Sequence, residues 1–206
     1  MEEVIPGVLH WTAYHGGIGS SVHSHLHVPS GALFDPLLPE DVSVEALADA
    51  VVPSVILLSN RHHLRSAGEI AAAFGIEILC QASGLWEFSD VDDPEVRGFA
   101  YGDEVAPGVT ALELGVLTPE DTVFHLDAGP GALLFADGLI RPAGELAFVP
   151  DGLMGDDPTA VRRGLRERLA GLAERDDFDA LLFAHGAPLP AGGRAALRAF
   201  AAADPR

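Results

Sequence analysis

Two adjacent histidines and two arginines fall within one short polar stretch, residues 59–65. Histidine can act as a general base or as a metal ligand, and arginine can hold an anionic group. The stretch lies between an apolar run at 55–58, typical of a buried strand, and a helical pattern at 66–74. In open α/β sheets, ligand sites form at the carboxyl ends of strands. This turn is therefore the first candidate site.

A second group of histidines lies within a predicted strand at residues 21–28. His23, His25 and His27 alternate with other residues, so they share one face of that strand. Three imidazoles on one face could bind a metal ion. A half-exposed strand with a polar outer face accounts for the same pattern, and we favour that interpretation.

The composition argues against several classes of partner. The 206 residues include 31 acidic and 12 basic residues, a formal net charge of −19, and no lysine. This balance disfavours nucleic acids and anionic membrane surfaces as partners. The single cysteine, Cys80, excludes an intramolecular disulfide. The first residues lack the features of a signal peptide, and no apolar run approaches ~18 residues, so we expect a cytoplasmic protein.

The predicted elements that must position these residues alternate between strands and helices. Further short apolar runs, bounded by Gly, Pro and Asp turns, predict strands at 109–114, 122–126, 132–135 and 180–184. Helices are predicted at 43–51, 158–175 and 193–202. No linker or internal repeat divides the chain. We therefore expect a single domain, residues 1–206, of layered sheets with outer helices.

The order of these features resembles the metallo-β-lactamase fold superfamily. In that family an Asp step follows a strand, a His-x-His-x-Asp-His turn opens a helix, and Gly-His-Thr-Pro, Gly-Asp and His-Gly turns follow. The matching segments here are Phe34-Asp35-Pro36, Asn60 to Arg65, Val116 to Pro119, Ala136-Asp137-Gly138 and His185-Gly186. The resemblance covers roughly residues 4–188. It implies an α/β fold, a four-layer αββα sandwich with two mixed sheets and outer helices.

The resemblance also implies that most metal ligands of the family are replaced. His62 and His185 keep their positions, and the bridging aspartate falls on Gly138, with Asp137 one residue early. The four replacements of ligands are Asn60, Leu64, Arg65 and Leu117. A two-metal site needs about seven donors, and leucine and arginine cannot coordinate a cation. We therefore expect no dinuclear centre, and no metal cofactor.

The expected function is that of a degenerate family member that binds a small molecule or a protein without hydrolysis. His62 and His185 are its candidate catalytic residues, facing each other at the mouth of the sheets, with His63 pointing to solvent. The candidate ligand-binding residues are Asn60, Arg65 and Asp137. The Arg65 guanidinium is expected to fill the emptied metal position and to pair with Asp137.

Two enzymatic alternatives stay open. The first is a hydrolase of esters, thioesters or phosphoesters that uses a single zinc, manganese or iron ion on His62, Asp137 and His185. The second is a metal-free enzyme in which Arg65 holds an anionic substrate and His62 or His185 acts as general base. The sequence identifies neither substrate nor protein partner, and it is compatible with a homodimer.

Overall fold

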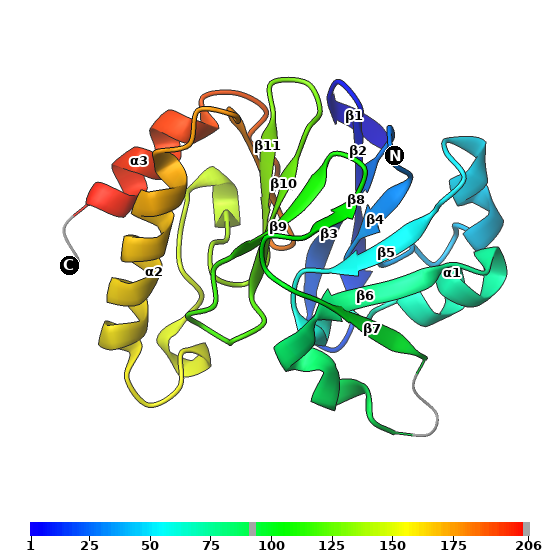
Figure 1. Ribbon diagram of the computed structural model, residues 1–206, viewed down its shortest axis with the longest axis horizontal. Coiled ribbons are helices and arrows are strands. Elements are labelled where there is room, and N and C mark those ends of the chain that lie inside the picture. Colours follow the sequence, from blue (N-terminus) through cyan, green and yellow to red (C-terminus); the bar gives the residue numbers. More distant parts are fainter. Residues whose placement is uncertain (91–93, 204–206) are drawn as a thin grey trace.

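The computed structural model describes residues 1–90 and 94–203, and its core is a pair of β-sheets packed face to face. In Figure 1, helices α2 (Pro158–Ala173) and α3 (Gly193–Ala202) lie on one side of the pair and α1 (Ala67–Phe74) lies on the other. The α/β four-layer αββα sandwich expected from the sequence is confirmed. No helix among residues 1–90 and 94–203 is long and apolar enough to span a membrane.

The first sheet contains seven strands in the order β1 to β7. Neighbouring strands are antiparallel from β1 to β4 and parallel from β4 to β7, so the sheet is mixed. Its strands are β1 (Glu2–Ile5), β2 (Val8–His15), β3 (Ser20–His27), β4 (Ala32–Phe34), β5 (Val55–Leu58), β6 (Glu77–Gln81) and β7 (Val96–Phe99).

The second sheet contains five strands in the order β12-β11-β10-β9-β8. Only β11 and β12 run parallel, so this sheet is also mixed. Its strands are β8 (Glu104–Ala106), β9 (Val109–Glu113), β10 (Thr122–Leu126), β11 (Ala132–Phe135) and β12 (Ala180–Phe183).

The helices pack on the outer faces. The predicted helix at 43–51 forms a short 3₁₀ helix, η1 (Val44–Asp49), which packs with α1 outside the first sheet. In α2, Asp157 accepts a hydrogen bond from the Ala160 amide, and Pro158 fits the first turn because that position needs no N–H donor. The remaining 3₁₀ turns are η2 (Arg61–His63), η3 (Ala82–Phe88), η4 (Pro142–Gly144) and η5 (Asp151–Leu153).

Strand β5 shows why the central apolar run is continuous. Leu57 points between the sheets, where it joins Phe34 and Phe124, whereas Ile56 and Leu58 point outward to the layer of α1. All four of its residues therefore need apolar side chains, since both faces of the strand are covered. Each fully buried leucine contributes about 1.5–3 kcal/mol relative to exposure.

The face of β3 that carries the histidines differs from the prediction. His25 pairs with Phe34 and His27 with Ala32, and these two partners belong to the core between the sheets. The histidine face therefore points inward, and the expected polar outer face is wrong. Alternation places residues on a common face, but it does not say which face meets the second sheet.

Candidate metal centre

The candidate site forms where parallel strand pairs from both sheets end. Asp35 follows β4, the 59–65 turn follows β5, Asp137 lies just beyond β11, and His185 lies just beyond β12. Backbone hydrogen bonds join the sheets here, from the Thr122 amide to the carbonyl of Ser59 (2.9 Å) and from the His23 amide to that of Ala184 (3.0 Å). The carboxyl ends of parallel strands thus converge from two sheets on one point.

Three donor atoms meet at that point. The Oδ1 atom of Asp137 lies 3.1 Å from Nε2 of His185 and 3.5 Å from Nε2 of His63, and the two Nε2 atoms are 3.3 Å apart. Three ligand atoms at these separations surround a space that suits one cation. We call His63, Asp137 and His185 the HDH cluster.

The structure places His63 in the cluster, where the sequence predicted His62. The turn folds as the 3₁₀ helix η2, and not as an extended segment, so residues three apart share a face. Asn60 and His63 therefore point to the same side, whereas His62 is exposed. His63 is only 4% exposed, which corrects the expectation that it points to solvent. His62 cannot face His185 in this arrangement.

Asp35 and Ser59 fix the orientation of His63. The Asp35 carboxylate lies 3.1 Å from Nδ1 of His63 and accepts hydrogen bonds from the amide (2.8 Å) and the hydroxyl of Ser59. A carboxylate that binds one imidazole nitrogen leaves the other nitrogen aimed at the site, as in many metal centres. Neither residue was among the predicted site residues, although Asp35 directly follows a buried strand and belongs to a segment that matches the metallo-β-lactamase pattern.

Asn60 positions two parts of the site. Its Nδ2 donates to Oδ2 of Asp137 (2.9 Å), which leaves Oδ1 for the cluster, and its Oδ1 accepts the amide hydrogen of His62 (2.8 Å). The second bond caps η2 and holds the turn in its 3₁₀ form. Of the predicted site residues, the structure thus brings together Asn60, Asp137 and His185.

Arg65 lies beside the site, where its guanidinium binds backbone carbonyl groups. Its Nη1 donates to the carbonyl oxygens of Asp35 (2.7 Å) and His23 (3.2 Å), which ties the 59–65 turn to β3 and β4. The expected ion pair with Asp137 is not present among the hydrogen bonds and salt bridges of residues 1–90 and 94–203. Arg65 therefore makes no direct pair with Asp137, although the charge of Asp137 acts on its pKa against the stronger effect of burial.

The carboxylates around His63 favour its charged form. Burial acts against a charged His63, but Asp35 and Asp137 outweigh it and raise the pKa of His63 to about 9. Burial also acts to raise the pKa of Asp137, yet His63 and His185 hold it well below its usual range. In the metal-free protein at neutral pH, an imidazolium at His63 therefore lies between two carboxylates.

Gly138, the other position considered for the bridging aspartate, has no room for a side chain. A Cβ atom there would overlap Leu114 and lie 2.6 Å from Oδ2 of Asp121. Asp121 is itself fully buried, and its burial together with the nearby charge of Asp137 raises its pKa well above normal. Asp137 is thus the acid that supplies the cluster, and Asp121 packs behind it.

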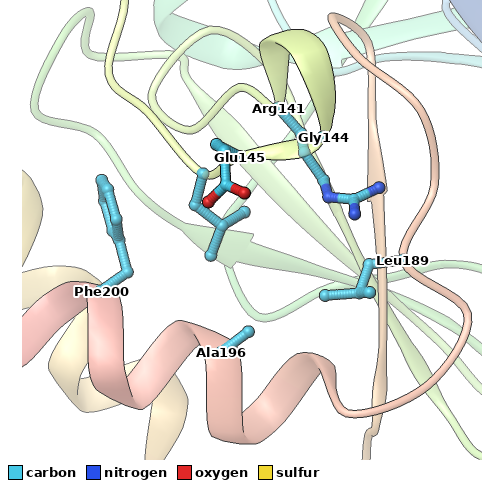
Figure 2. A pocket seen from close by; sticks show the side chains of 7 residues that line it. Arg141, Gly144, Glu145, Leu189, Ala196 and Phe200 are labelled. Atoms are coloured by element: carbon cyan, nitrogen blue, oxygen red, sulfur yellow. The ribbon is translucent and has the colours of Figure 1, made fainter.

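A hollow of about 230 Å³ lies on another side of the second sheet (Figure 2). Arg141, Glu145 and Leu189 line it together with Ala196 and Phe200 of α3. Arg141 is already engaged there, because its Nη1 donates to the carbonyl oxygens of Ala187 and Pro188. The hollow is smaller than the ~300 Å³ at which ligand pockets begin, and no member of the HDH cluster lines it.

Comparisons with known proteins identify the fold. No family model matches the sequence, and no curated protein matches it. Among solved structures, TTHA1623 in a di-iron-bound form aligns with a TM-score of 0.65 at 20% identity, covering 92% of this chain and 99% of that one. BLEG-1, a B3 metallo-β-lactamase, aligns with a TM-score of 0.63 at 15% identity, covering 90% and 95%.

A metallo-β-lactamase from Staphylococcus aureus subsp. aureus COL aligns with a TM-score of 0.61 at 12% identity. The alignment covers 88% of this chain, which spans only 57% of the staphylococcal protein. At these identities the similarity concerns the backbone, and the site must be judged from its own residues. The chain has the metallo-β-lactamase fold.

Proposed function

We propose that this protein is a hydrolase that uses one divalent metal ion held by His63, Asp137 and His185. The observation that carries the proposal is the triangle of donor atoms, with edges of 3.1, 3.3 and 3.5 Å. A tetrahedral zinc ion with bonds of about 2.0–2.1 Å separates its ligands by about 3.3 Å. The three donors therefore fit such an ion and leave a fourth position open, as catalytic sites require.

Three donor residues are enough to hold one metal ion and too few for two. Within residues 1–90 and 94–203, the HDH cluster is the one group of three His, Cys, Asp or Glu donors that lie within 4.8 Å of one another. Two imidazoles and a carboxylate suit zinc, iron or manganese. A bound ion would supply Lewis-acid polarisation of a carbonyl or phosphoryl oxygen. TTHA1623, which shares the fold, has been observed with two iron ions.

Two residues around the cluster orient its donor atoms. Asp35 holds Nδ1 of His63, which leaves Nε2 free to hold an ion, and Asn60 holds Oδ2 of Asp137, which leaves Oδ1 for the same purpose. His63 must give up its Nε2 proton to coordinate, because only a neutral imidazole binds a metal. Asp35 remains bonded at Nδ1 and keeps the ring oriented during that exchange.

The substrates we propose are small esters, thioesters and phosphoesters, whose polarised oxygen would approach the cluster where His185 and Asp137 are partly exposed. Binding without hydrolysis is the second candidate. The observation that favours it is the position of His63 between Asp35 and Asp137, where a protonated ring offsets part of their negative charge without a metal ion. The two candidates differ in whether His63 keeps its Nε2 proton.

The test is a hydrolysis assay on zinc-loaded and manganese-loaded protein with a p-nitrophenyl ester, an acyl thioester and a p-nitrophenyl phosphate. We expect turnover of at least one compound by the wild type, retained in the matched control His62→Gln and lost in His63→Gln. Both histidines lie in the same turn, so a general disturbance of η2 would affect both variants. Absence of turnover in the metal-loaded wild type, or equal loss in the two variants, would contradict the proposal.

A further inference from the structure

An exposed tryptophan lies on the turn next to the one that carries His63. Strands β5 and β6 are parallel neighbours, so the turns that follow them, η2 and η3, lie at the same edge of the first sheet (Figure 1). Trp86 on η3 is 63% exposed, whereas the other tryptophan, Trp11, is only 7% exposed and donates its Nε1 hydrogen to the Leu37 carbonyl. An indole ring left in water, at the edge where ligand sites form, is a candidate contact surface.

A guanidinium group holds the indole ring of Trp86 from one side. Cζ of Arg61 lies 4.9 Å from the centroid of the ring, within the range of a cation–π interaction. Arg61 is itself fixed by two ion pairs, one with Glu120, whose side chain is 1% exposed, and one with Glu87, at 3.3 Å between Nε and Oε2. Because Arg61 covers one face of the ring, the exposed part of the side chain must include the opposite face.

Turn η3 also packs closely against η2. A Cβ atom at Gly84 would lie 2.9 Å from Cγ of Glu120 and 3.3 Å from Cβ of Arg61, so a larger residue there would press against both side chains. The Gln81 side chain caps η3 by accepting the amide hydrogen of Ser83 (2.7 Å). Trp86 is therefore ordered before any ligand arrives, and a ligand that stacks on it needs to immobilise little of the protein.

The charges beside the ring indicate what kind of group it accepts. Arg61 contributes one positive charge, and Glu87 and Glu120 contribute two negative charges, in a chain with a formal net charge of −19. An anionic group is therefore repelled from this surface. Arg61 already provides the cation that an indole attracts, so the opposite face is left for an uncharged ring. Aromatic rings stack on one another in offset or edge-to-face arrangements.

We infer that Trp86 binds an uncharged aromatic group of the ligand at the rim of the HDH cluster. The Cα atoms of Arg61 and His63, two residues apart, are separated by at most about 7 Å, and His62 between them is exposed. One short turn thus connects the ring to the cluster. The choice of substrate rests on the proposed function: aromatic esters and thioesters are preferred, and anionic phosphoesters are disfavoured. Binding of the aromatic group itself does not rest on it.

The binding test uses full-length ¹⁵N-labelled protein in chelator, so that metal-dependent hydrolysis does not occur. The two tryptophans give two indole N–H signals in NMR spectra, and the signal that is absent from Trp86→Leu belongs to Trp86. The probes are N-benzylacetamide, an uncharged aromatic amide, and N-(cyclohexylmethyl)acetamide, whose ring is saturated. We expect a saturable shift of the Trp86 signal, no shift of the Trp11 signal, and about 2–10-fold tighter binding of the aromatic amide.

Two variants at this position separate stacking from apolar contact. Trp86→Leu keeps an apolar side chain without a flat ring, whereas Trp86→Phe keeps a flat ring, and the exposure of the position lets the fold tolerate both. Ligand-observed NMR should show that the preference for the aromatic amide disappears in Trp86→Leu and remains in Trp86→Phe. An unmoved Trp86 signal in the wild type, or the same preference in Trp86→Leu, would overturn the inference.

Hydrolysis of benzyl acetate and cyclohexylmethyl acetate by zinc-loaded protein separates this inference from the proposed function. We expect kcat/KM to be about 2–10-fold higher for benzyl acetate, and the ratio to approach one in Trp86→Leu. Hydrolysis of both esters without this preference would overturn the inference and leave the proposed function intact. Binding of the aromatic amide at Trp86 without hydrolysis of either ester would contradict the proposed function and support the aromatic site.

Discussion

Two groups of histidines lie in the interior of this protein, yet the pKa values of His63 and His23 shift in opposite directions. His63 lies between Asp35 and Asp137, and its pKa rises to about 9. His23 lies among other histidines and near Arg65, and its pKa falls to about 4. Burial disfavours the charged form in both places, so the neighbouring carboxylates account for the difference. The fold thus favours the charged form of one histidine and the neutral form of others within the same end of the molecule.

The largest expected effect comes from removing a carboxylate from the charged group. Asp35→Ala should destabilise the metal-free protein by about 3–5 kcal/mol at pH 6, because it breaks a fully buried ion pair. The control is Asp177→Ala, whose partly exposed ion pairs with Arg175 and His125 should together cost at most about 1 kcal/mol. Urea unfolding of both variants measures the difference. Similar losses would show that Asp35 does not act through His63.

The pH dependence of stability should distinguish the two groups by sign. The folded pKa of His63 is about 9, above the unfolded value near 6.5, so its contribution is complete below pH 6.5 and is lost as pH rises through 9. The folded pKa of His23 is about 4, so its contribution is complete above pH 6.5 and is lost as pH falls through 4. Each effect is on the order of a few kcal/mol or less.

Urea unfolding in chelator at pH 5, 7 and 9.5 tests these signs. His63→Gln should remove much of the loss of stability on the alkaline side, and His23→Gln should reduce the loss on the acid side. The same pH profile in His63→Gln and in the wild type would contradict the assignment of a cation at His63.

A smaller effect is expected from Asn60, which positions the charged group without carrying charge. Asn60→Ala removes the cap of η2 and the bond to Asp137, and should cost about 1–2 kcal/mol of stability. Zinc affinity at the HDH cluster should fall about 10–100-fold, as for other partners of metal ligands. Calorimetric titration of the variant measures that loss. Unchanged affinity would mean that Asp137 is oriented by other contacts.

Much of the architecture could be predicted because it depends on local patterns. The apolar run of β5 and the capped helix α2 lie within a few residues of where the sequence placed them. The inward face of β3 could not be predicted in this way. Choosing that face requires knowing that His25 pairs with Phe34, whose side chain packs against the second sheet.

The site was predictable in its location and not in its detail. The turn after β5 and the turn after β12 were found because parallel strands deliver polar residues to one edge. His63 joins the cluster in place of the predicted His62 because the turn adopts the 3₁₀ form of η2, which the Asn60 side chain stabilises. The role of Asp35 depends on a contact between strands remote in sequence. Neither the Asn60 cap nor the contact between Asp35 and His63 produces a repeating pattern of polar and apolar residues that could be read from the sequence.

The most direct test of the central claim is the number of zinc equivalents bound by the wild type, His62→Gln and His63→Gln under identical loading. We predict that His62→Gln binds as many equivalents as the wild type and that His63→Gln binds one fewer. The same number of equivalents in all three proteins, or a loss confined to His62→Gln, would contradict a single-ion site on His63, Asp137 and His185.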